Sequence, residues 1–296
     1  MALEILSKNV VLNGGSTAFN FNNPVTQFLA GVASFQLSYG NSDDHHIEQM
    51  SIQLTTGKPS SQQVTVGAAV VFDDASGHPI DKAASYVTVS VIAWTGAPTS
   101  KVLLSPPYAV ADHSQSPGIL LPGTPNPVLQ ATLAGFYLSY GNTDHHVETV
   151  TVSVGASSPI NNTSSISAIA AMHDASGNVA ANPTATGSLI ATSINDPGFV
   201  VVPYQAQIGT GQTSIPMGAT ITNAVSFLTG FQAQYSNADD HHVRTIGAGP
   251  NQTGVDPNNH SNAQTSGVWA WMYDGSNNHQ DNNNSYASIV VVGLVG

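Results

Sequence analysis

The stretch "YGNSDDHHIEQMSIQL" (residues 39–54) places a polar loop directly before a strand whose side chains alternate in character. In its second half Met50, Ile52 and Leu54 alternate with Gln and Ser. This period of two predicts an antiparallel strand with one face in a core and the other in water. The acids and the first histidine are therefore expected at the tip of a hairpin.

The same loop occurs twice more, as "YGNTDHHVE" (140–148) and "YSNADDHHVR" (235–244). Three Asp-containing turns follow in the same order, "FDDASGH" (72–78), "MHDASGN" (172–178) and "MYDGSNN" (272–278). Several separate features thus keep one order and nearly one spacing, which indicates an internal repeat.

Alternating strands, frequent Gly, Pro and Asn turns, and the lack of a convincing helical period predict an all-β protein. We expect three tandem antiparallel β-sandwich repeats, each of about 100 residues and close to an immunoglobulin or jelly-roll unit in size. Pro-containing joints place these units at 1–98, 99–196 and 197–296. The alternative is one merged body with pseudo-threefold symmetry.

The composition limits the classes of partner. The chain has 296 residues, 41% of them hydrophobic, which is enough to build cores. Five basic against 17 acidic side chains give a net charge of −12, the wrong sign for binding nucleic acid. The absence of cysteine excludes disulfides, cysteine-ligated metals and thiol catalysis.

We also expect no membrane insertion, because the apolar run "SIVVVGLVG" (288–296) is far shorter than the roughly 20 residues of a membrane span. No signal peptide is visible, since Glu4 stands where such a peptide carries positive charge. Low charge with abundant Asn, Ser, Thr, Gly and Ala is nevertheless typical of an extracellular or particle-surface protein.

The histidine pairs are the candidate metal ligands. Alternation points His45 and His46 to opposite faces, whereas His46 and Glu48 share a face with about 6.6–6.8 Å between their Cα atoms. An imidazole and a carboxylate at this spacing can meet one metal ion. The candidate ligands are Asp44, His46, Glu48, Asp144, His146, Glu148, Asp240 and His242. No cofactor is certain, and the ion expected at these tips is divalent, either Ca²⁺ or of the Zn²⁺ kind.

The third loop differs because Arg244, the only arginine, stands where the other two have glutamate. We hypothesise that the three poles lie near each other and that Arg244 pairs with a glutamate of another unit or subunit. The residues expected to contact a ligand or another copy at these poles are Tyr39, Asn41, Tyr140, Asn142, Tyr235, Asn237 and Arg244.

Three interpretations of the loops remain open. Each loop can be a well-made turn, with Asn41 and Asp44 bonding their own backbone and the second histidine closing the core edge against Tyr39. It can instead hold a transition metal through the second histidine and an acid. A calcium site formed by the Asn and Asp oxygens is the third interpretation.

The motifs favour a protein that is not an enzyme. No GxSxG elbow, HExxH helix or GxxxxGK[ST] loop occurs. A site repeated three times is typical of multivalent binding or of assembly. We therefore predict a structural or adhesive protein that self-assembles as a surface-layer, filament or particle subunit, with its own copies as partners. The alternative is a multivalent lectin-like protein, with or without a metal requirement, that binds glycans through the Asn/Asp/His tips and through exposed aromatics such as Trp94, Trp269 and Trp271. A hydrolase is the distant alternative.

Overall fold

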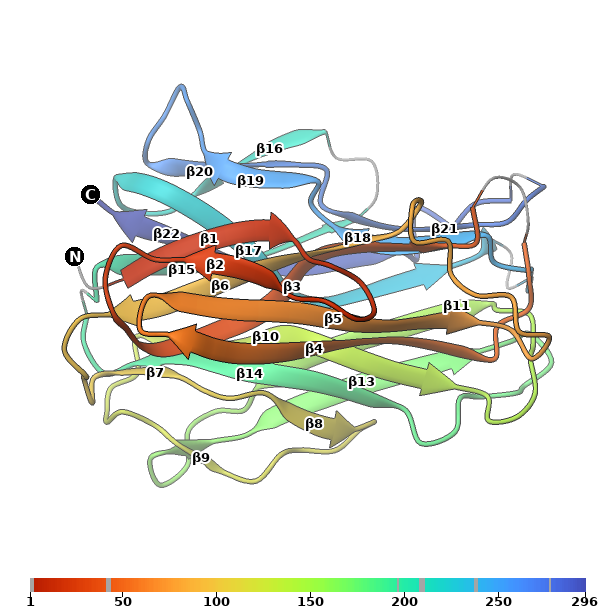
Figure 1. The fold of residues 1–296 in the computed structure, drawn as a ribbon, viewed down its shortest axis with the longest axis horizontal. Helices are drawn as coiled ribbons and strands as arrows, with labels where there is room; N and C mark the ends of the chain where they lie inside the picture. The colour runs from red at the N-terminus through yellow and green to blue at the C-terminus, as the bar shows by residue number, and fades with distance from the viewer. Residues whose placement is uncertain (1–2, 41–43, 196, 208–210, 237–238, 277) are drawn as a thin grey trace.

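The computed structural model describes residues 3–40, 44–195, 197–207, 211–236, 239–276 and 278–296. Every named element in these residues is a β-strand, and all pairs of named strands are antiparallel (Figure 1). The prediction of an all-β protein with several sheets is confirmed. Among the described residues there is no helix able to cross a membrane.

Three large sheets form the body. The first contains, in spatial order, β1 (Leu3–Asn9), β6 (Tyr86–Thr95), β3 (Val25–Ser38), β18 (Thr245–Gly249) and β21 (Trp269–Tyr273). The second contains β2 (Thr17–Asn20), β5 (Gln63–Asp73), β4 (Gln49–Ser60), β10 (Val128–Ser139), β14 (Thr184–Thr192) and β7 (Val102–Leu104), with β8 (Tyr108–Ala111) also on β14. The third contains β13 (Ile166–His173), β11 (Thr149–Ala156), β17 (Ile221–Gln234), β22 (Tyr286–Val295) and β15 (Phe199–Gln207).

Two small sheets extend from this body. One is the pair β9 (Ile119–Leu120) and β12 (Thr163–Ser164). The other contains β16 (Gln212–Pro216), β20 (Asn262–Ser266) and β19 (Gln252–Val255).

Each large sheet is shared by two of the three chain segments. Strand β4 of the first segment pairs with β10 of the second, and β11 of the second pairs with β17 of the third. Strand β18 of the third segment pairs with β3 of the first, so the exchange closes into a cycle. The sheets therefore cross the expected boundaries between 1–98, 99–196 and 197–296. Alternation in the sequence decides which face of a strand is buried, but it does not decide which strand lies beside it.

The central strands β3, β10 and β17 carry the same irregularity. The register against the neighbouring strand shifts between Val32 and Ser34, between Leu133 and Gly135, and between Leu228 and Gly230. Such bulges bend a strand and increase its twist.

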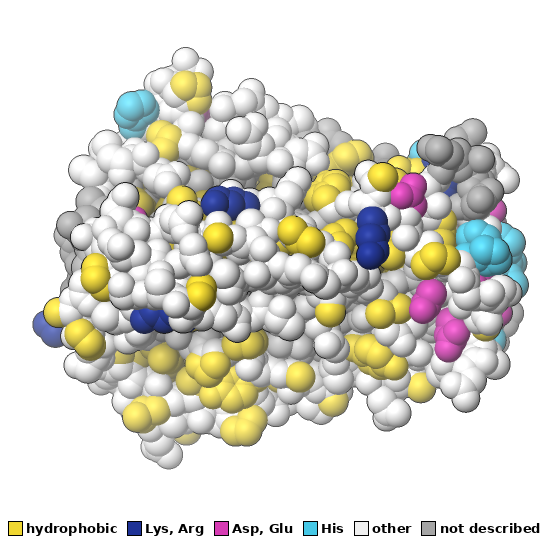
Figure 2. Space-filling view, in the orientation of Figure 1, with side chains coloured by type: hydrophobic (Ala, Val, Ile, Leu, Met, Phe, Trp, Pro, Cys, Tyr) yellow, Lys and Arg dark blue, Asp and Glu magenta, His cyan; other side chains and the backbone are white. Residues whose placement is uncertain are grey.

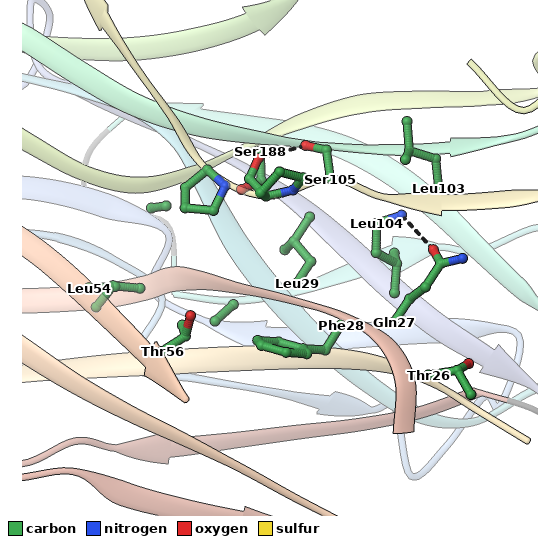
Figure 3. A pocket seen from close by; sticks show the side chains of 14 residues that line it. Thr26, Gln27, Phe28, Leu29, Leu54, Thr56, Leu103, Leu104, Ser105 and Ser188 are labelled. Carbon is green, nitrogen blue, oxygen red and sulfur yellow. Dashed lines mark hydrogen bonds between the residues drawn. The ribbon is translucent and has the colours of Figure 1, made fainter. Parts of the chain in front are cut away.

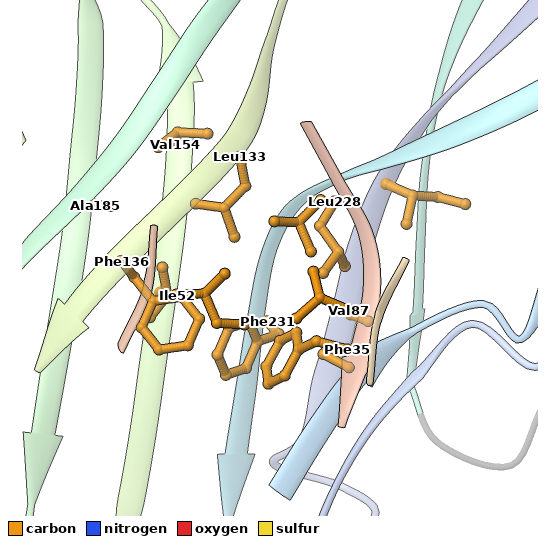
Figure 4. Packing of buried hydrophobic residues seen from close by; sticks show 14 of the residues in the cluster. Phe35, Ile52, Val87, Leu133, Phe136, Val154, Ala185, Leu228 and Phe231 are labelled. Atoms are coloured by element: carbon orange, nitrogen blue, oxygen red, sulfur yellow. The ribbon is translucent and has the colours of Figure 1, made fainter. Parts of the chain in front are cut away.

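Three phenylalanines, one from each central strand, meet where the three sheets come together (Figure 4). The ring centroids of Phe35, Phe136 and Phe231 lie 5.1–5.7 Å apart, and all three rings are buried. Tilted and edge-to-face arrangements at this distance are the favourable ones for aromatic rings. This cluster marks the axis around which the three segments are arranged.

The two ends of the body differ. Both chain ends lie at one end, while the loops that follow β3, β10 and β17 lie at the other (Figure 1). Histidine and acidic side chains gather at the loop end of the face shown in Figure 2.

Candidate functional site

The three His-His loops meet in one structure, which we call the apex and define as residues 44–48, 144–148 and 240–244. Three isolated antiparallel bridges join them in a ring: His45 with Val243, Ile47 with His145, and Val147 with His241. Six backbone hydrogen bonds of 2.9–3.3 Å close this ring, two for each bridge. Each loop is thus bonded to both of the others.

The second histidine of each pair lies at the centre of the apex. The ring centroids of His46, His146 and His242 are 4.5–4.8 Å apart. One ring nitrogen of each lies within 4.8 Å of the other two. The neighbouring Ile47, Val147 and Val243 are fully buried, whereas these three histidine side chains are 39–40% exposed.

An aspartate from a neighbouring segment faces each of these rings. Nδ1 of His146 lies 3.1 Å from the carboxylate of Asp240, and the other two distances are 3.5 Å. The other two pairs are His46 with Asp144 and His242 with Asp44. The sequence suggested these aspartates as metal ligands. In the structure each of them faces a histidine Nδ1 instead.

The aspartates are themselves held by backbone N–H groups. The second carboxylate oxygen of Asp44 accepts a hydrogen bond of 2.9 Å from Gly275, and Asp144 and Asp240 accept from Ala75 and Ala175 at 3.3 and 3.2 Å. Burial acts to raise the pKa of Asp44, but the hydrogen bond from Gly275 and the neighbouring His242 outweigh it and hold this pKa below its usual range. The carboxylate is therefore favoured in its charged form.

Within the described part of the loops, this arrangement leaves one nitrogen free on each central ring. Because Nδ1 faces a carboxylate, Nε2 is the nitrogen that can bind a metal ion. Metal-ligating histidines commonly donate their other ring N–H to a carboxylate, which fixes the ring and its tautomer. Among the described residues, the apex can therefore offer three imidazole ligands.

The first histidine of each pair belongs to a different cluster. His45 lies 3.2 Å from the carboxylate of Asp74, and His145 and His241 lie 3.3 and 3.5 Å from the equivalent Asp174 and Asp274. These buried aspartates close their own turns; for example, Asp174 accepts from the backbone of Ser176 and Asn178 at 2.9 and 2.8 Å.

One of these clusters contains a second histidine. His45, Asp74 and His78 could also hold a metal, since their ligand atoms lie within 4.8 Å of one another. In the other two segments, Asn178 and Asn278 bond the turn aspartate where His78 does in the first. Because an asparagine amide takes the place of the His78 ring in two segments, we infer that the residue at this position stabilises the turn.

The glutamates expected to share a metal with the second histidine have other partners. Glu148 lies 3.5 Å from Nδ1 of His173 and accepts a hydrogen bond of 3.3 Å from Gln234. Glu48 lies beside Asp73, whose pKa is raised first by burial and then by the charges of Glu48 and Asp74. The expected pairing assumed a continuous strand, but residues 45–48 form only isolated bridges, so the regular spacing does not apply.

Arg244 occupies the same position in the third segment and stacks on an aromatic ring. Its guanidinium carbon lies 4.8 Å from the centroid of Tyr273. Within the part of the chain that the structure describes, Arg244 forms no ion pair, so the hypothesised glutamate partner is not found there. Positions 48, 148 and 244 each face the residue that precedes the turn aspartate, at position 73, 173 or 273. The sequence interpretation did not include this relation. The first position is Glu, Glu and Arg in the three segments and the second is Asp, His and Tyr, so both positions are polar or aromatic throughout and only the third segment changes both.

The expected pole tyrosines are almost completely buried. Tyr39, Tyr140 and Tyr235 pack against the first histidine of their loops with ring centroids 4.7–4.8 Å apart. The expectation that the second histidine closes the core edge against Tyr39 is therefore wrong, because the second histidine turns to the axis. Burial is the main cause that raises the pKa of all three hydroxyls.

The remaining pole residues are asparagines. Asn142 is exposed. Asn41 and Asn237 lie outside the described residues.

An apolar cavity lies away from the apex, between β3, β4, β7 and β14 (Figure 3). It has a volume of about 400 Å³ and is lined mainly by apolar side chains such as Phe28, Leu29 and Leu104. No charged side chain lines it, and Gln27 accepts a hydrogen bond of 3.3 Å from the backbone of Leu104. It therefore offers no acid or base for catalysis.

A second cavity, of about 280 Å³, is lined by aromatic and amide side chains. Trp269 and Trp271 lie with their ring centroids 5.0 Å apart, and Nε1 of Trp269 is buried without a hydrogen-bond partner among the described residues. The other lining residues are Gln36, Tyr86, Asn251, Tyr273, His279 and Gln280. Trp94 lies elsewhere, where its Nε1 donates a hydrogen bond of 3.0 Å to Ala97.

Fold and site together define an all-β protein with a threefold apex of histidines and aspartates. No family model, curated protein or solved structure matches the chain.

Proposed function

We propose that the chain is a non-enzymatic structural protein, a self-assembling subunit of a surface layer, filament or particle. In this proposal its segments are three copies of one β-sandwich unit that exchanged strands and merged into a single body. The observation that carries the proposal is the pairing of polar side chains between segments at the apex. Each aspartate of the central trio faces a histidine of another segment, so these groups hold the segments together.

The mixed sheets support the same role. Separating one segment would break two of the three pairings β4–β10, β11–β17 and β18–β3 and expose strand edges. Unpaired strand edges invite association with other chains. An interlocked body avoids such edges in its interior and is suited to a component that must keep its shape.

Contacts between copies need exposed apolar surface, and the small β9–β12 sheet provides some. Leu120 and Ile160 are each 71% exposed and are the most exposed large apolar side chains among the described residues. Thr163 pairs with both of them, so they lie close together. We propose a second copy of the chain as the partner of this surface.

The test is the size of the purified protein as a function of concentration, measured by native mass spectrometry and electron microscopy. Regular assemblies are expected, and the variant Leu120→Ser/Ile160→Ser is expected to shift them to smaller species. Val11→Ser, at another exposed apolar position, is the matched control. A monomer at every concentration would contradict the proposal.

Glycan binding is the second candidate, favoured by the cavity around Trp269 and Trp271. Sugar rings stack on aromatic faces, while amides such as Gln36 and Asn251 and the unpartnered indole N–H can bond hydroxyl groups. Tryptophan fluorescence titrated with maltotriose and with chitotriose tests this. A saturating change that Trp269→Ala removes and Trp94→Ala keeps supports glycan binding, and no change with either sugar counts against it.

A further inference from the structure

We propose that His46, His146 and His242 bind one divalent transition-metal ion of the Zn²⁺ kind through their Nε2 atoms. The ion would lie on the axis of the apex and would be shared by all three segments. This inference does not depend on whether the chain assembles.

The donor set is the first argument. Three imidazoles converge with one nitrogen of each within 4.8 Å of the others, and each Nδ1 faces an aspartate at 3.1–3.5 Å. Imidazole nitrogen suits Zn²⁺, Cu²⁺ and Ni²⁺, whereas Ca²⁺ prefers oxygen. The apex thus has three carboxylate–histidine pairs ready to orient their free nitrogens.

The aspartates that orient the histidines are themselves held in place. Each aspartate is fixed by a backbone N–H of a turn in another segment, at Ala75, Ala175 or Gly275. A ring held by a fixed carboxylate loses less freedom when it binds a metal ion. All three segments repeat this pairing of a fixed aspartate with a central histidine. Turn formation does not explain the repetition, because other aspartates, Asp74, Asp174 and Asp274, already close the turns.

The distances are compatible with binding after a small adjustment. Zn–N bonds of about 2.1 Å place tetrahedral ligand nitrogens about 3.4 Å apart. The three rings are inclined to one another by 66–84°, as blades around an axis, and are 39–40% exposed. They can therefore rotate inward without displacing core residues, and a fourth position stays open to solvent.

Charge favours a cation at this place. Three aspartates surround the rings, and the chain carries a net charge of −12. A divalent cation on the axis would offset part of the negative charge of these three carboxylates.

The alternative group His45, Asp74 and His78 is a weaker candidate. The carboxylate of Asp74 accepts hydrogen bonds from the backbone of Ser76 and His78 and from the His78 ring, so its oxygens are already used. The experiment nevertheless has to separate the two groups.

Calorimetric titration of the EDTA-treated, dialysed full chain with ZnCl₂ tests the proposal. We expect one ion per chain, no displacement by excess CaCl₂, and a rise in the unfolding temperature on binding. The triple variant His46→Ala/His146→Ala/His242→Ala is expected to lose this binding. Two controls, His45→Ala in the alternative group and His260→Ala at an exposed loop, are expected to keep it.

Two measurements avoid reliance on the triple variant, which can fail to fold. Co²⁺ added to the wild-type chain is expected to give the intense visible absorption of a tetrahedral site, and Zn²⁺ is expected to remove it. Asp240→Asn, which changes the group that faces Nδ1 of His146 and leaves all three histidines in place, is expected to weaken Zn²⁺ binding about 10–100-fold. The proposal is overturned if the wild-type chain takes up no Zn²⁺, if a folded triple variant still binds it, or if only His45→Ala abolishes binding.

Discussion

The carboxylate of Asp240 accepts a hydrogen bond from Nδ1 of His146 at 3.1 Å, across two segments of the chain that are 94 positions apart. His146 has an aspartate of its own loop, Asp144, but that residue faces His46 instead. The apex is therefore built from contacts between segments.

A double-mutant cycle on His146 and Asp240 measures this relation. With His146→Ala and Asp240→Asn we expect a coupling energy of about 0.2–1 kcal/mol, since both side chains are partly exposed. The measurement is the urea unfolding free energy in the presence of EDTA, so that no metal ion contributes. The matched cycle of His146→Ala with Asp144→Asn is expected to show no coupling, and equal coupling in both cycles would refute this arrangement.

The sequence predicted well what depends on neighbouring residues. Alternation such as that of Met50 and Ile52 predicts strands because the face that a residue occupies follows from its position along the strand. The partners of those strands were not predictable, since β4 finds its neighbour β10 about 80 residues away. His46 could be proposed as a ligand, and the three poles were expected near each other. That its ring would face His146 and His242 instead of Glu48 could not be predicted, because this depends on which strands become neighbours.

Arg244 and Tyr273 provide a second test, because each segment has a different pair at this position. Arg244→Glu is expected to lower the unfolding temperature, since the carboxylate would face the electron-rich ring and lose a cation–π contact of about 0.5–1 kcal/mol. The double variant Arg244→Glu/Tyr273→His recreates the pair formed by Glu148 and His173 and is expected to recover part of the loss. If the double variant is less stable than the sum of both single changes, the interpretation of these positions as matched pairs is wrong.

Asp73 is a site where removal of a charge should stabilise the protein. Its pKa is raised by burial and by Glu48 and Asp74, so its charged form is less stable in the folded chain than in the unfolded chain. One carboxylate oxygen is buried without a partner among the described residues. Asp73→Asn is expected to raise the unfolding temperature at neutral pH, and Glu48→Gln is expected to do so as well.

The control for Asp73 is Asp74, whose pKa shifts in the opposite direction. Burial acts to raise that pKa, but hydrogen bonds and the charges of His78 and His45 lower it. Asp74→Asn is therefore expected to destabilise the fold under the same conditions. Equal effects of the two substitutions would show that the environment of each carboxylate does not control its contribution.

A substitution of Gly247 tests how closely β18 packs against Trp271 beside the aromatic cavity. A Cβ atom at this position would lie 2.2 Å from the ring of Trp271 and 2.5 Å from the backbone oxygen of Phe35. Gly247→Ala is expected to displace the indole, lower the unfolding temperature and change tryptophan fluorescence. Gly254→Ala, where a Cβ atom would meet nothing within 4 Å, is the matched control and is expected to leave both unchanged. Unchanged fluorescence in Gly247→Ala would show that Trp271 does not pack against this strand.

Acid unfolding provides the last test, on the turn and apex carboxylates. Asp44, Asp74, Asp112 and Asp174 all have a pKa below the ordinary 3.8, because hydrogen bonds from backbone or side chains and nearby histidines outweigh the effect of burial. A carboxyl with a lowered folded pKa contributes stability that is full above the unfolded pKa and is lost as the pH falls through the folded value. This contribution is therefore expected to be constant near neutral pH and to disappear below about pH 4.

Urea midpoints measured from neutral to acidic pH, for the wild-type chain and for Asp174→Asn, test this expectation. Asp174→Asn keeps one acceptor oxygen but replaces the other, which accepts from the amide of Asn178 and faces His145, with an NH₂ group. It is expected to lower stability at neutral pH by about 1–3 kcal/mol. The difference between the two chains should then shrink in acid, where the wild-type carboxyl is protonated too. A difference that stays constant down to the lowest pH would mean that the charge of Asp174 does not contribute, and that only its shape is needed.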